Sequence, residues 1–448
     1  MNEIKVFSWG SGNLGQLGLG NTDDSVSSPS LVLLSNNEIR KVNDIVGGGS
    51  HTMMVANDGD LYTFGSNDCG QLGFKLLENQ KYITTPQPVD YFKNNSIKIK
   101  NCSGGWSHSL ACDVNGFVYS WGSNSHSQLG LTFNAIDTTE KEKKPQQLPI
   151  KIDSNNNNNN NSNTEVKRKI VFKKKIINNI NKENQFNPIN INYFINEKIK
   201  IISVSCGMRH SIVLSSDFKV YGWGCNKFGQ LSNNVQGVLQ ELPKLLEFGG
   251  EGVSQISCGF KHTVLLDTTK KKLITFGFNR YGQLGNGNTT DQSQPVIIPI
   301  EPILNDGDCS VIVKEIQCGW SNSCFLTNQG KLYLCGRGEY GILGDERDLT
   351  VDLSVQNIFK VLKSKPFNSE PISSFSMGSE HVLIQLENND IYSVGWNEHY
   401  QLGLCEVVIP GKDGDNKSIP QLLPSIKGSG DYSFVKTGSG HSFFIVNK

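Results

Sequence analysis

Residues 9–18 read Trp-Gly-Ser-Gly-Asn-Leu-Gly-Gln-Leu-Gly, and versions of this stretch occur seven times along the 448-residue chain. Each copy opens with an aromatic or apolar residue followed by glycine. These glycines are Gly10, Gly65, Gly122, Gly224, Gly277, Gly336 and Gly395. Successive ones are separated by 55, 57, 102, 53, 59 and 59 residues. A period in the fifties with one doubled interval predicts a repeat architecture, so we expect one domain over residues 1–448.

The residues between these copies have the pattern of short strands. Residues 201–206 lead into a second repeated motif, Gly-x-x-His, and residues 210–214 and 220–223 flank a hairpin turn. A fourth strand is expected around a proline, which suits an outer edge because it lacks a backbone donor. These prolines are Pro29, Pro86, Pro145, Pro243, Pro295 and Pro420. Four antiparallel strands per repeat predict an all-β fold, a seven-bladed β-propeller of four-stranded blades.

The two ends of the chain complement each other in this scheme. Residues 438–446 supply the inner strands of a blade without an aromatic-glycine strand after them, and residues 1–9 supply that strand. Joining the two would complete the last blade and remove both sheet edges. We therefore predict that the N- and C-terminal segments close the last blade jointly.

The loop residues of the first motif suggest two backbone and packing roles. The third residue after the aromatic is Gly12, Asn67, Asn124, Asn226, Asn279, Gly338 or Asn397. Glycine and asparagine tolerate a left-handed backbone best, so a positive φ is predicted there. A leucine follows in every copy, and we expect it to fill the space between neighbouring blades. These leucines are Leu17, Leu72, Leu129, Leu231, Leu284, Leu343 and Leu402.

Composition excludes several classes of protein. Lys plus Arg and Asp plus Glu number 42 each, so no overall field attracts nucleic acid or membranes. No apolar run approaches the about 18 residues of a spanning helix, and the first residues lack a secretory signal. Cys206, Cys258 and Cys318 occupy equivalent places in different repeats and so cannot pair. We expect reduced thiols and an intracellular protein, with cytoplasm and nucleus both open.

The paired motifs, aromatic-Gly-x-Asn-x-x-Gly-Gln-Leu-Gly and Gly-x-x-His-Ser/Thr, resemble the regulator of chromosome condensation repeat. The resemblance covers the chain except for one insertion. Members of that family include an exchange factor for a small nuclear GTPase, a plant ultraviolet sensor and interaction domains of larger proteins. The resemblance implies the propeller strongly and a function only weakly, because one fold hosts many functions.

This chain departs from both specialised relatives. The exchange factor uses acidic residues on one face, a projecting wedge and a basic N-terminal tail that helps it bind chromatin. Here there is no such tail, Asn13 stands where an acid is expected, and the loop Ser123–Leu129 keeps the plain repeat pattern. Only Glu380 supplies an acid before the repeated histidine. The ultraviolet sensor stacks several tryptophans after the repeated glycine, whereas here only Trp106 and Trp320 occur, on non-adjacent blades.

The recurring histidines invite a metal-site hypothesis. They are His51, His108, His210, His262, His381 and His441, with Asn322 at the seventh place. Equivalent positions around a ring should lie too far apart to share one ion at bonds near about 2 Å. Adjacent Ser50 and His51 would point to opposite faces of a strand, which disfavours a catalytic pair. We predict structural histidines, with no catalytic, cofactor or metal site.

One insertion is peculiar to this chain. Residues 151–198, between the third and fourth repeats, contain seven consecutive asparagines and carry nine Lys or Arg against four Asp or Glu. The plainest interpretation is a solvated low-complexity loop. The alternative is a nuclear-import or partner-binding segment. The candidate residues are Lys167, Arg168, Lys169, Lys173, Lys174 and Lys175.

These observations predict a non-enzymatic protein–protein interaction platform, since loops on a rigid scaffold carry the variable chemistry. The alternative is a guanine-nucleotide exchange factor for a small GTPase, with chromatin association as a further option. We expect a monomer that binds a protein partner without a cofactor and without a membrane.

Overall fold

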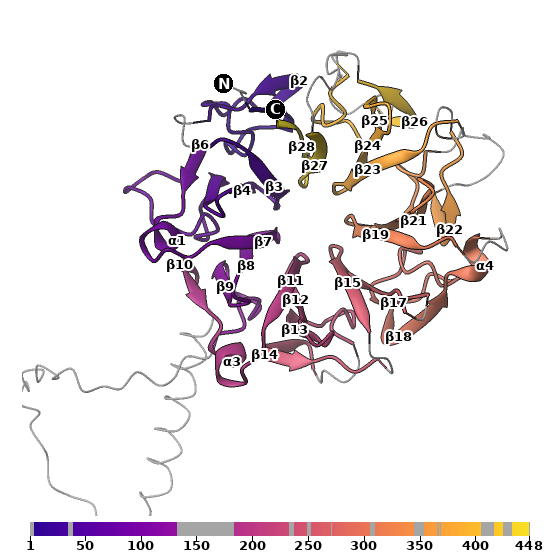
Figure 1. The fold of residues 1–448 in the computed structure, drawn as a ribbon, viewed down its shortest axis with the longest axis horizontal. Coiled ribbons are helices and arrows are strands. Elements are labelled where there is room, and N and C mark those ends of the chain that lie inside the picture. Colours follow the sequence, from indigo (N-terminus) through magenta and orange to yellow (C-terminus); the bar gives the residue numbers. More distant parts are fainter. Residues whose placement is uncertain are drawn as a thin grey trace, which may run out of the picture.

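The computed structural model describes residues 4–34, 39–131, 183–232, 237–248, 252–269, 271–304, 310–344, 354–364, 367, 369–404, 416–423 and 432–447. Seven four-stranded antiparallel sheets stand around a central axis like the blades of a propeller (Figure 1). The predicted fold is therefore confirmed. In every blade the second strand is wholly buried, and the fourth lies at the rim.

The blades follow one another in chain order, each running from the axis outward. The first blade holds β3 (Val42–Gly47), β4 (His51–Ala56), β5 (Leu61–Ser66) and β6 (Tyr82–Pro88). The second holds β7 (Ile99–Gly104), β8 (His108–Asp113), β9 (Val118–Gly122) and β10 (Gln185–Asn190). The third holds β11 (Ile201–Cys206), β12 (His210–Ser215), β13 (Val220–Cys225) and β14 (Leu239–Leu245).

The other four blades repeat this arrangement. The fourth holds β15 (Val253–Cys258), β16 (His262–Asp267), β17 (Lys272–Gly277) and β18 (Gln292–Pro299). The fifth holds β19 (Val313–Cys318), β20 (Asn322–Thr327), β21 (Leu332–Arg337) and β22 (Val355–Val361). The sixth holds β23 (Ile372–Met377), β24 (His381–Leu386), β25 (Ile391–Gly395) and β26 (Lys417–Leu422). The seventh holds β27 (Tyr432–Thr437), β28 (His441–Asn447), β1 (Lys5–Ser11) and β2 (Ser25–Leu31).

The seventh blade joins the two ends of the chain, as the sequence predicted. Strand β1 pairs antiparallel with β28, from Lys5 opposite Val446 to Gly10 opposite His441. The side chain of Asn447 then exchanges hydrogen bonds with the backbone of Val42 in the first blade, at 3.0 and 2.9 Å. Closure therefore rests on a sheet ladder and on direct contacts to the next blade.

Apolar residues fill the spaces between neighbouring blades. One such cluster joins Met53 and Leu61 of the first blade to Ile99 and Trp121 of the second. All seven repeated leucines are buried, which agrees with the packing role predicted for them. Short helices add to these contacts where the chain passes to the next blade. They are α1 (Asp90–Asn94), α3 (Asn192–Asn196) and α4 (Glu301–Leu304).

The outer strand of the second blade differs from the sequence-based expectation. The strand that pairs with β9 contains Pro188, so Pro188 and not Pro145 is the outer-strand proline of the second blade. The described end of the segment 151–198 thus contributes β10 and α3 to the propeller. Because β9 ends at Gly122 and β10 begins at Gln185, the additional residues connect two strands of one blade.

The repeated asparagines do not have the positive φ that we predicted. Positive φ occurs three residues later instead, at Gly15, Gly70, Ser127, Gly229, Gly282, Gly341 and Tyr400. The side chain explains the asparagine: Asn67 Oδ1 accepts the backbone N–H of Leu72 at 2.9 Å, while its Nδ2 donates to the Phe74 carbonyl at 2.8 Å. The residue therefore fixes the loop by hydrogen bonding across it.

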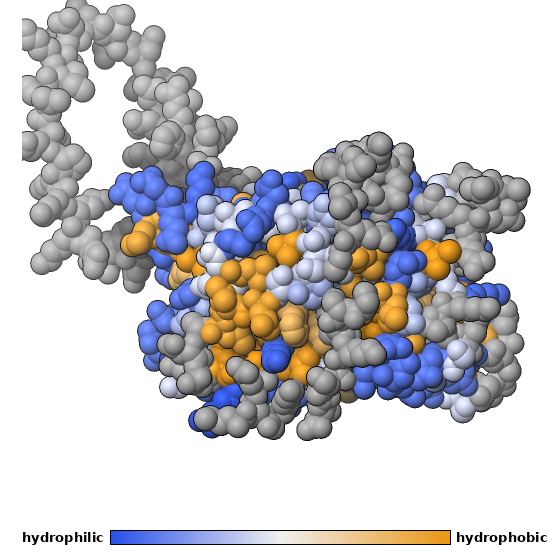
Figure 2. All heavy atoms as spheres, turned by 90° about the horizontal axis from the view of Figure 1, so that it is seen from above, coloured by the Kyte–Doolittle hydropathy of each residue, from blue (hydrophilic) through white to orange (hydrophobic). Residues whose placement is uncertain are grey.

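The rim carries exposed apolar side chains. Figure 2 looks at the part of the rim where β2 lies and shows apolar atoms gathered near its middle. Leu31 and Leu33, at the end of β2 and just beyond it, are 53% and 52% exposed. Exposed leucines of this kind are common and do not by themselves mark a binding site. None of the helices in the described segments is long and apolar enough to span a bilayer.

Candidate functional site

Both repeated motifs lie on the same side of the propeller. In the sheet register His108 is opposite Gly122, His210 opposite Gly224 and His262 opposite Gly277. The loop before each histidine and the loop after each aromatic-glycine pair therefore emerge together. We call the surface made by these two sets of loops the glycine–histidine face. The hairpins between the second and third strands form the opposite face.

The glycines of the aromatic-glycine pairs are required by close packing. All seven have positive φ, from 97° at Gly122 to 118° at Gly336. At Gly65 (φ 107°) a Cβ atom would lie 2.6 Å from the Ser50 carbonyl oxygen and 2.7 Å from the Cα of His51. Any side chain would strain the backbone and collide with the neighbouring strand. Glycine at these positions lets the neighbouring strand approach closely.

The six repeated histidines link each blade to the next. Each Nε2 lies within hydrogen-bond distance of a serine or threonine hydroxyl on the following blade. The pairs are His51–Ser109 (2.9 Å), His108–Ser211 (3.1 Å), His210–Thr263 (3.3 Å), His262–Ser323 (2.9 Å), His381–Ser442 (3.0 Å) and His441–Thr52 (3.2 Å). We call this set the histidine–hydroxyl ring.

The hydroxyl partners fix the protonation of the histidines. The Ser109 hydroxyl donates to the Gln71 carbonyl at 2.9 Å, so it can only accept a hydrogen bond from His51 Nε2. The remaining nitrogen, Nδ1, is buried without a hydrogen-bond partner in all six histidines. Burial lowers the pKa of His51 to about 4 and that of each of the other five to about 3. The rings are therefore neutral at physiological pH.

The hydrogen bonds of the histidine–hydroxyl ring connect neighbouring blades. The six histidines point to separate inter-blade partners and do not converge on one point. Across the described segments, no group of three or more His, Cys, Asp or Glu has the geometry of metal ligands. The nine cysteines of these segments are free thiols. Cys206, for example, directs its Sγ to the Ser103 carbonyl of the neighbouring blade at 3.2 Å.

The ring has one gap. Asn322 replaces histidine on the fifth blade, and Val382 replaces the hydroxyl residue on the sixth. Asn322 instead donates from Nδ2 to the Arg337 carbonyl of its own blade at 2.8 Å. The histidine donor and the hydroxyl acceptor are both absent from this junction. No hydroxyl is therefore left there without a hydrogen-bond donor.

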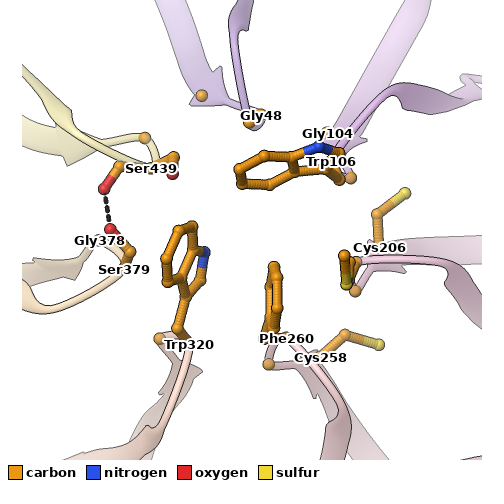
Figure 3. A pocket seen from close by; sticks show the side chains of 18 of the residues that line it. Gly48, Gly104, Trp106, Cys206, Cys258, Phe260, Trp320, Gly378, Ser379 and Ser439 are labelled. Carbon is orange, nitrogen blue, oxygen red and sulfur yellow. Dashed lines mark hydrogen bonds between the residues drawn. The ribbon is translucent and has the colours of Figure 1, made fainter. Parts of the chain in front are cut away.

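Three aromatic side chains meet over the axis of the propeller (Figure 3). Ring centroids are separated by 5.6 Å for Trp106–Trp320, 5.9 Å for Trp106–Phe260 and 4.7 Å for Phe260–Trp320. Below them the repeated glycines line a cavity of about 110 Å³. The two tryptophans belong to non-adjacent blades, as the sequence indicated, but their side chains reach across the axis and pack together. Sequence spacing did not reveal this because the loops converge at the axis.

Cationic and aromatic side chains gather on the loops of the third and fourth blades. Lys261 Nζ lies 5.0, 5.4 and 5.5 Å from the ring centroids of Phe228, Phe260 and Phe278. Arg209 lies beside His126, with an N–N distance of 3.2 Å. Lys227 and Arg280 are exposed on the adjacent loops. We call Arg209, Lys227, Lys261, Arg280 and the rings around them the basic–aromatic surface.

The basic–aromatic surface was not among the predicted site residues. The signal for it was present, because Arg209 and Lys261 stand before the repeated histidine where Ser50, Ser107 and Ser321 occur in other repeats. The candidate residues of the insertion, Lys167, Arg168, Lys169, Lys173, Lys174 and Lys175, lie outside the described residues.

The loops of the fifth and sixth blades carry a cluster that contains both acidic and basic groups. Glu380 is buried, with one carboxyl oxygen unpartnered. Burial raises its pKa to about 8, although Arg337 and Ser321 act in the opposite direction. Arg337 lies over the rings of Tyr340 and Tyr281, at 4.5 and 4.9 Å, and pairs with Glu339. This cluster balances its own charge, unlike the basic–aromatic surface.

Known sequences and structures share this architecture. The model of the RCC1-like domain matches residues 172–444, and that of the regulator of chromosome condensation (RCC1) repeat matches residues 5–55, 58–112 and 115–163. An RCC1 domain-containing protein of Dictyostelium discoideum is 53% identical over 99% of this chain and 100% of its own length. The ultraviolet-B receptor UVR8 of Arabidopsis thaliana is 28% identical over 95% of this chain and 79% of its own length.

Solved structures show the same fold at lower identity. Prp20p of Saccharomyces cerevisiae superposes with a TM-score of 0.74 at 22% identity, covering 99% of this chain and 92% of that one. Human WBSCR16 superposes with a TM-score of 0.73 at 18% identity, covering 100% and 99%. With the repeats, the closed ring and a relative of more than half identity in agreement, this chain belongs to the regulator of chromosome condensation (RCC1) repeat family.

Proposed function

We propose that this protein is a non-enzymatic protein-binding platform that contacts its partner through the glycine–histidine face. The observation that carries the proposal is the concentration of cations at the basic–aromatic surface. Elsewhere cations pair with acids: Lys98–Asp60 (2.6 Å), Lys219–Asp217 (2.8 Å) and Lys272–Asp267 (3.8 Å) on the opposite face, and Arg337 with Glu339 on the glycine–histidine face. On the glycine–histidine face, Arg209, Lys227, Lys261 and Arg280 form no ion pair with any described residue.

Arginines beside partly exposed aromatic rings have the composition of a protein interface. Arginine and aromatic residues are enriched where protein partners bind, and they supply most binding hot spots. The loops that carry them are fixed by the ring of blades, so little freedom would be lost on binding. A partner with acidic residues would complement these charges and would be steered toward this face.

The test compares three forms of the full chain as affinity baits, with bound proteins quantified by mass spectrometry. The first is the wild type, and the second is Arg209→Ser with Lys261→Ser, which inserts the residue found in three other repeats. The third is Lys200→Ser with Lys219→Ser, a charge-matched control on the opposite face of the third blade. We expect the second bait alone to lose its partner. Equal capture by all three baits would contradict the proposal.

The alternative function is guanine-nucleotide exchange on a small GTPase, with or without chromatin association. It draws on Prp20p, whose structural study describes binding to Gsp1p and histones. That likeness concerns the fold, and the basic–aromatic surface favours an acidic partner of unspecified class. Release of labelled nucleotide from a panel of small GTPases separates the two: we expect no acceleration, and an acceleration would replace the platform by the exchange factor.

A further inference from the structure

A cavity of about 480 Å³ opens within the basic–aromatic surface, over the loops of the third blade. Its volume falls in the range, about 300–1,000 Å³, that accommodates organic ligands and side chains. Phe228, Phe260, Met208 and Val238 are among the apolar groups that line it. A cavity of this kind can take an apolar group from a partner.

The rim of this cavity is cationic. Among the described residues, Arg209, Lys227, Lys261 and His126 line it, and no aspartate or glutamate does. A ligand whose apolar group enters the cavity would therefore need anionic groups beside it to pair with the cations of the rim. Charge complementarity makes carboxylates the matching groups.

Two of the rim cations are held in place before any partner arrives. Lys261 lies among the three rings of Phe228, Phe260 and Phe278, which attract its ammonium group. Arg209 is positioned by His126: arginine can only donate, so His126 Nε2 is the acceptor, and its Nδ1 can donate to the Ser125 hydroxyl at 2.9 Å. Fixed cations lose less side-chain entropy when they bind an anion.

We propose that this cavity binds a peptide segment in which an apolar residue is flanked by acidic residues. The apolar side chain enters the cavity beside Met208, Phe228 and Val238. The flanking carboxylates contact Arg209, Lys227 and Lys261. The inference rests on the proposed platform function and names the chemistry of its partner. A nucleic acid is disfavoured because the cations surround one apolar cavity instead of forming an extended track for a phosphate backbone.

The probe is a fluorescein-labelled peptide with one leucine between runs of glutamate, titrated with the full-length protein by fluorescence anisotropy. Two control peptides replace the glutamates by lysines or the leucine by serine. We expect saturable binding of the first peptide only, weakened by added salt. Loss of the charge-assisted contacts in Arg209→Ser with Lys261→Ser should reduce affinity by about tenfold or more.

Val238→Trp tests the cavity itself. Val238 is 62% exposed, so the larger side chain can cover the opening without disturbing the core. We expect this variant to lose the leucine peptide and to retain the thermal stability of the wild type, while Lys200→Ser with Lys219→Ser binds normally. Equal binding of the lysine-flanked peptide, or unchanged binding by Val238→Trp, would overturn the inference.

The same variants separate this inference from the broader proposal. If Arg209→Ser with Lys261→Ser loses its captured partner while Val238→Trp keeps it, the face is a platform and the cavity inference is wrong. If neither variant loses a partner, the platform proposal itself is wrong. If both lose it and the leucine peptide competes with the partner, both statements hold.

Discussion

Acidification should unfold this propeller at a pH where most of its carboxylates are still charged. The six ring histidines are neutral in the fold, with pKa values near 3 or 4, whereas they titrate near 6.5 in an unfolded chain. Below pH 6.5 the unfolded state therefore binds more protons than the folded state. The six histidines contribute fully to the stability of the fold above pH 6.5, and this contribution is lost as the pH falls below that value.

The magnitude follows from proton linkage. Between pH 7 and pH 5, six histidines that protonate only on unfolding lower the free energy of unfolding by about 11 kcal/mol. Glu380 acts in the opposite direction, because its pKa is raised to about 8. Its folded form holds a proton that the unfolded form releases above about pH 4.5, which returns about 2–3 kcal/mol over the same interval. The net loss, about 9 kcal/mol, is comparable with the whole stability of many domains, about 5–15 kcal/mol.

The assay is urea unfolding of the full chain at pH 7, 6, 5.5 and 5, followed by circular dichroism and tryptophan fluorescence. We expect the midpoint to fall steeply with pH while the slope of the transition stays constant. His262→Asn, which inserts the residue found at Asn322, should reduce the proton uptake on unfolding by about one. A midpoint that is unchanged between pH 7 and pH 5 would refute the assignment of neutral, buried ring histidines.

Two further predictions concern the loops and the gap in the ring. Asn67→Gly should lower the free energy of unfolding by about 2–3 kcal/mol, because two hydrogen bonds across the loop are lost; if a positive φ were the reason for asparagine, glycine would be neutral or stabilising. Asn322→His combined with Val382→Ser should build the missing junction of the ring. A double-mutant cycle by thermal unfolding should give a favourable coupling of about 1 kcal/mol or more, and purely additive effects would contradict the pairing.

The sequence was sufficient to predict the number of blades, the closure of the ring and the buried leucines. Each of these depends on spacing, and the motifs repeat at a spacing set by one blade. The pairing of β1 with β28 could be predicted because each terminus carries the half-blade that the other lacks.

Other features could not be obtained from spacing. The role of Asn67 depends on which loop atoms its side chain reaches. Residue type alone is equally consistent with a positive φ, which the structure does not show there. The sequence pattern points to Pro145 for the outer strand of the second blade, because the long insertion hides where that strand begins. The contact between Trp106 and Trp320 arises because loops of non-adjacent blades converge at the axis. The basic–aromatic surface likewise required the third and fourth blades to be placed side by side.

The most direct test of the platform is the footprint of a captured partner on the full chain, measured by amide hydrogen–deuterium exchange at saturation. We predict protection in residues 207–209, 226–230 and 259–261 of the glycine–histidine face. The opposite-face hairpins, residues 113–117 and 215–219, should exchange as they do in the free protein. Protection confined to those hairpins, with the glycine–histidine loops unchanged, would contradict the account.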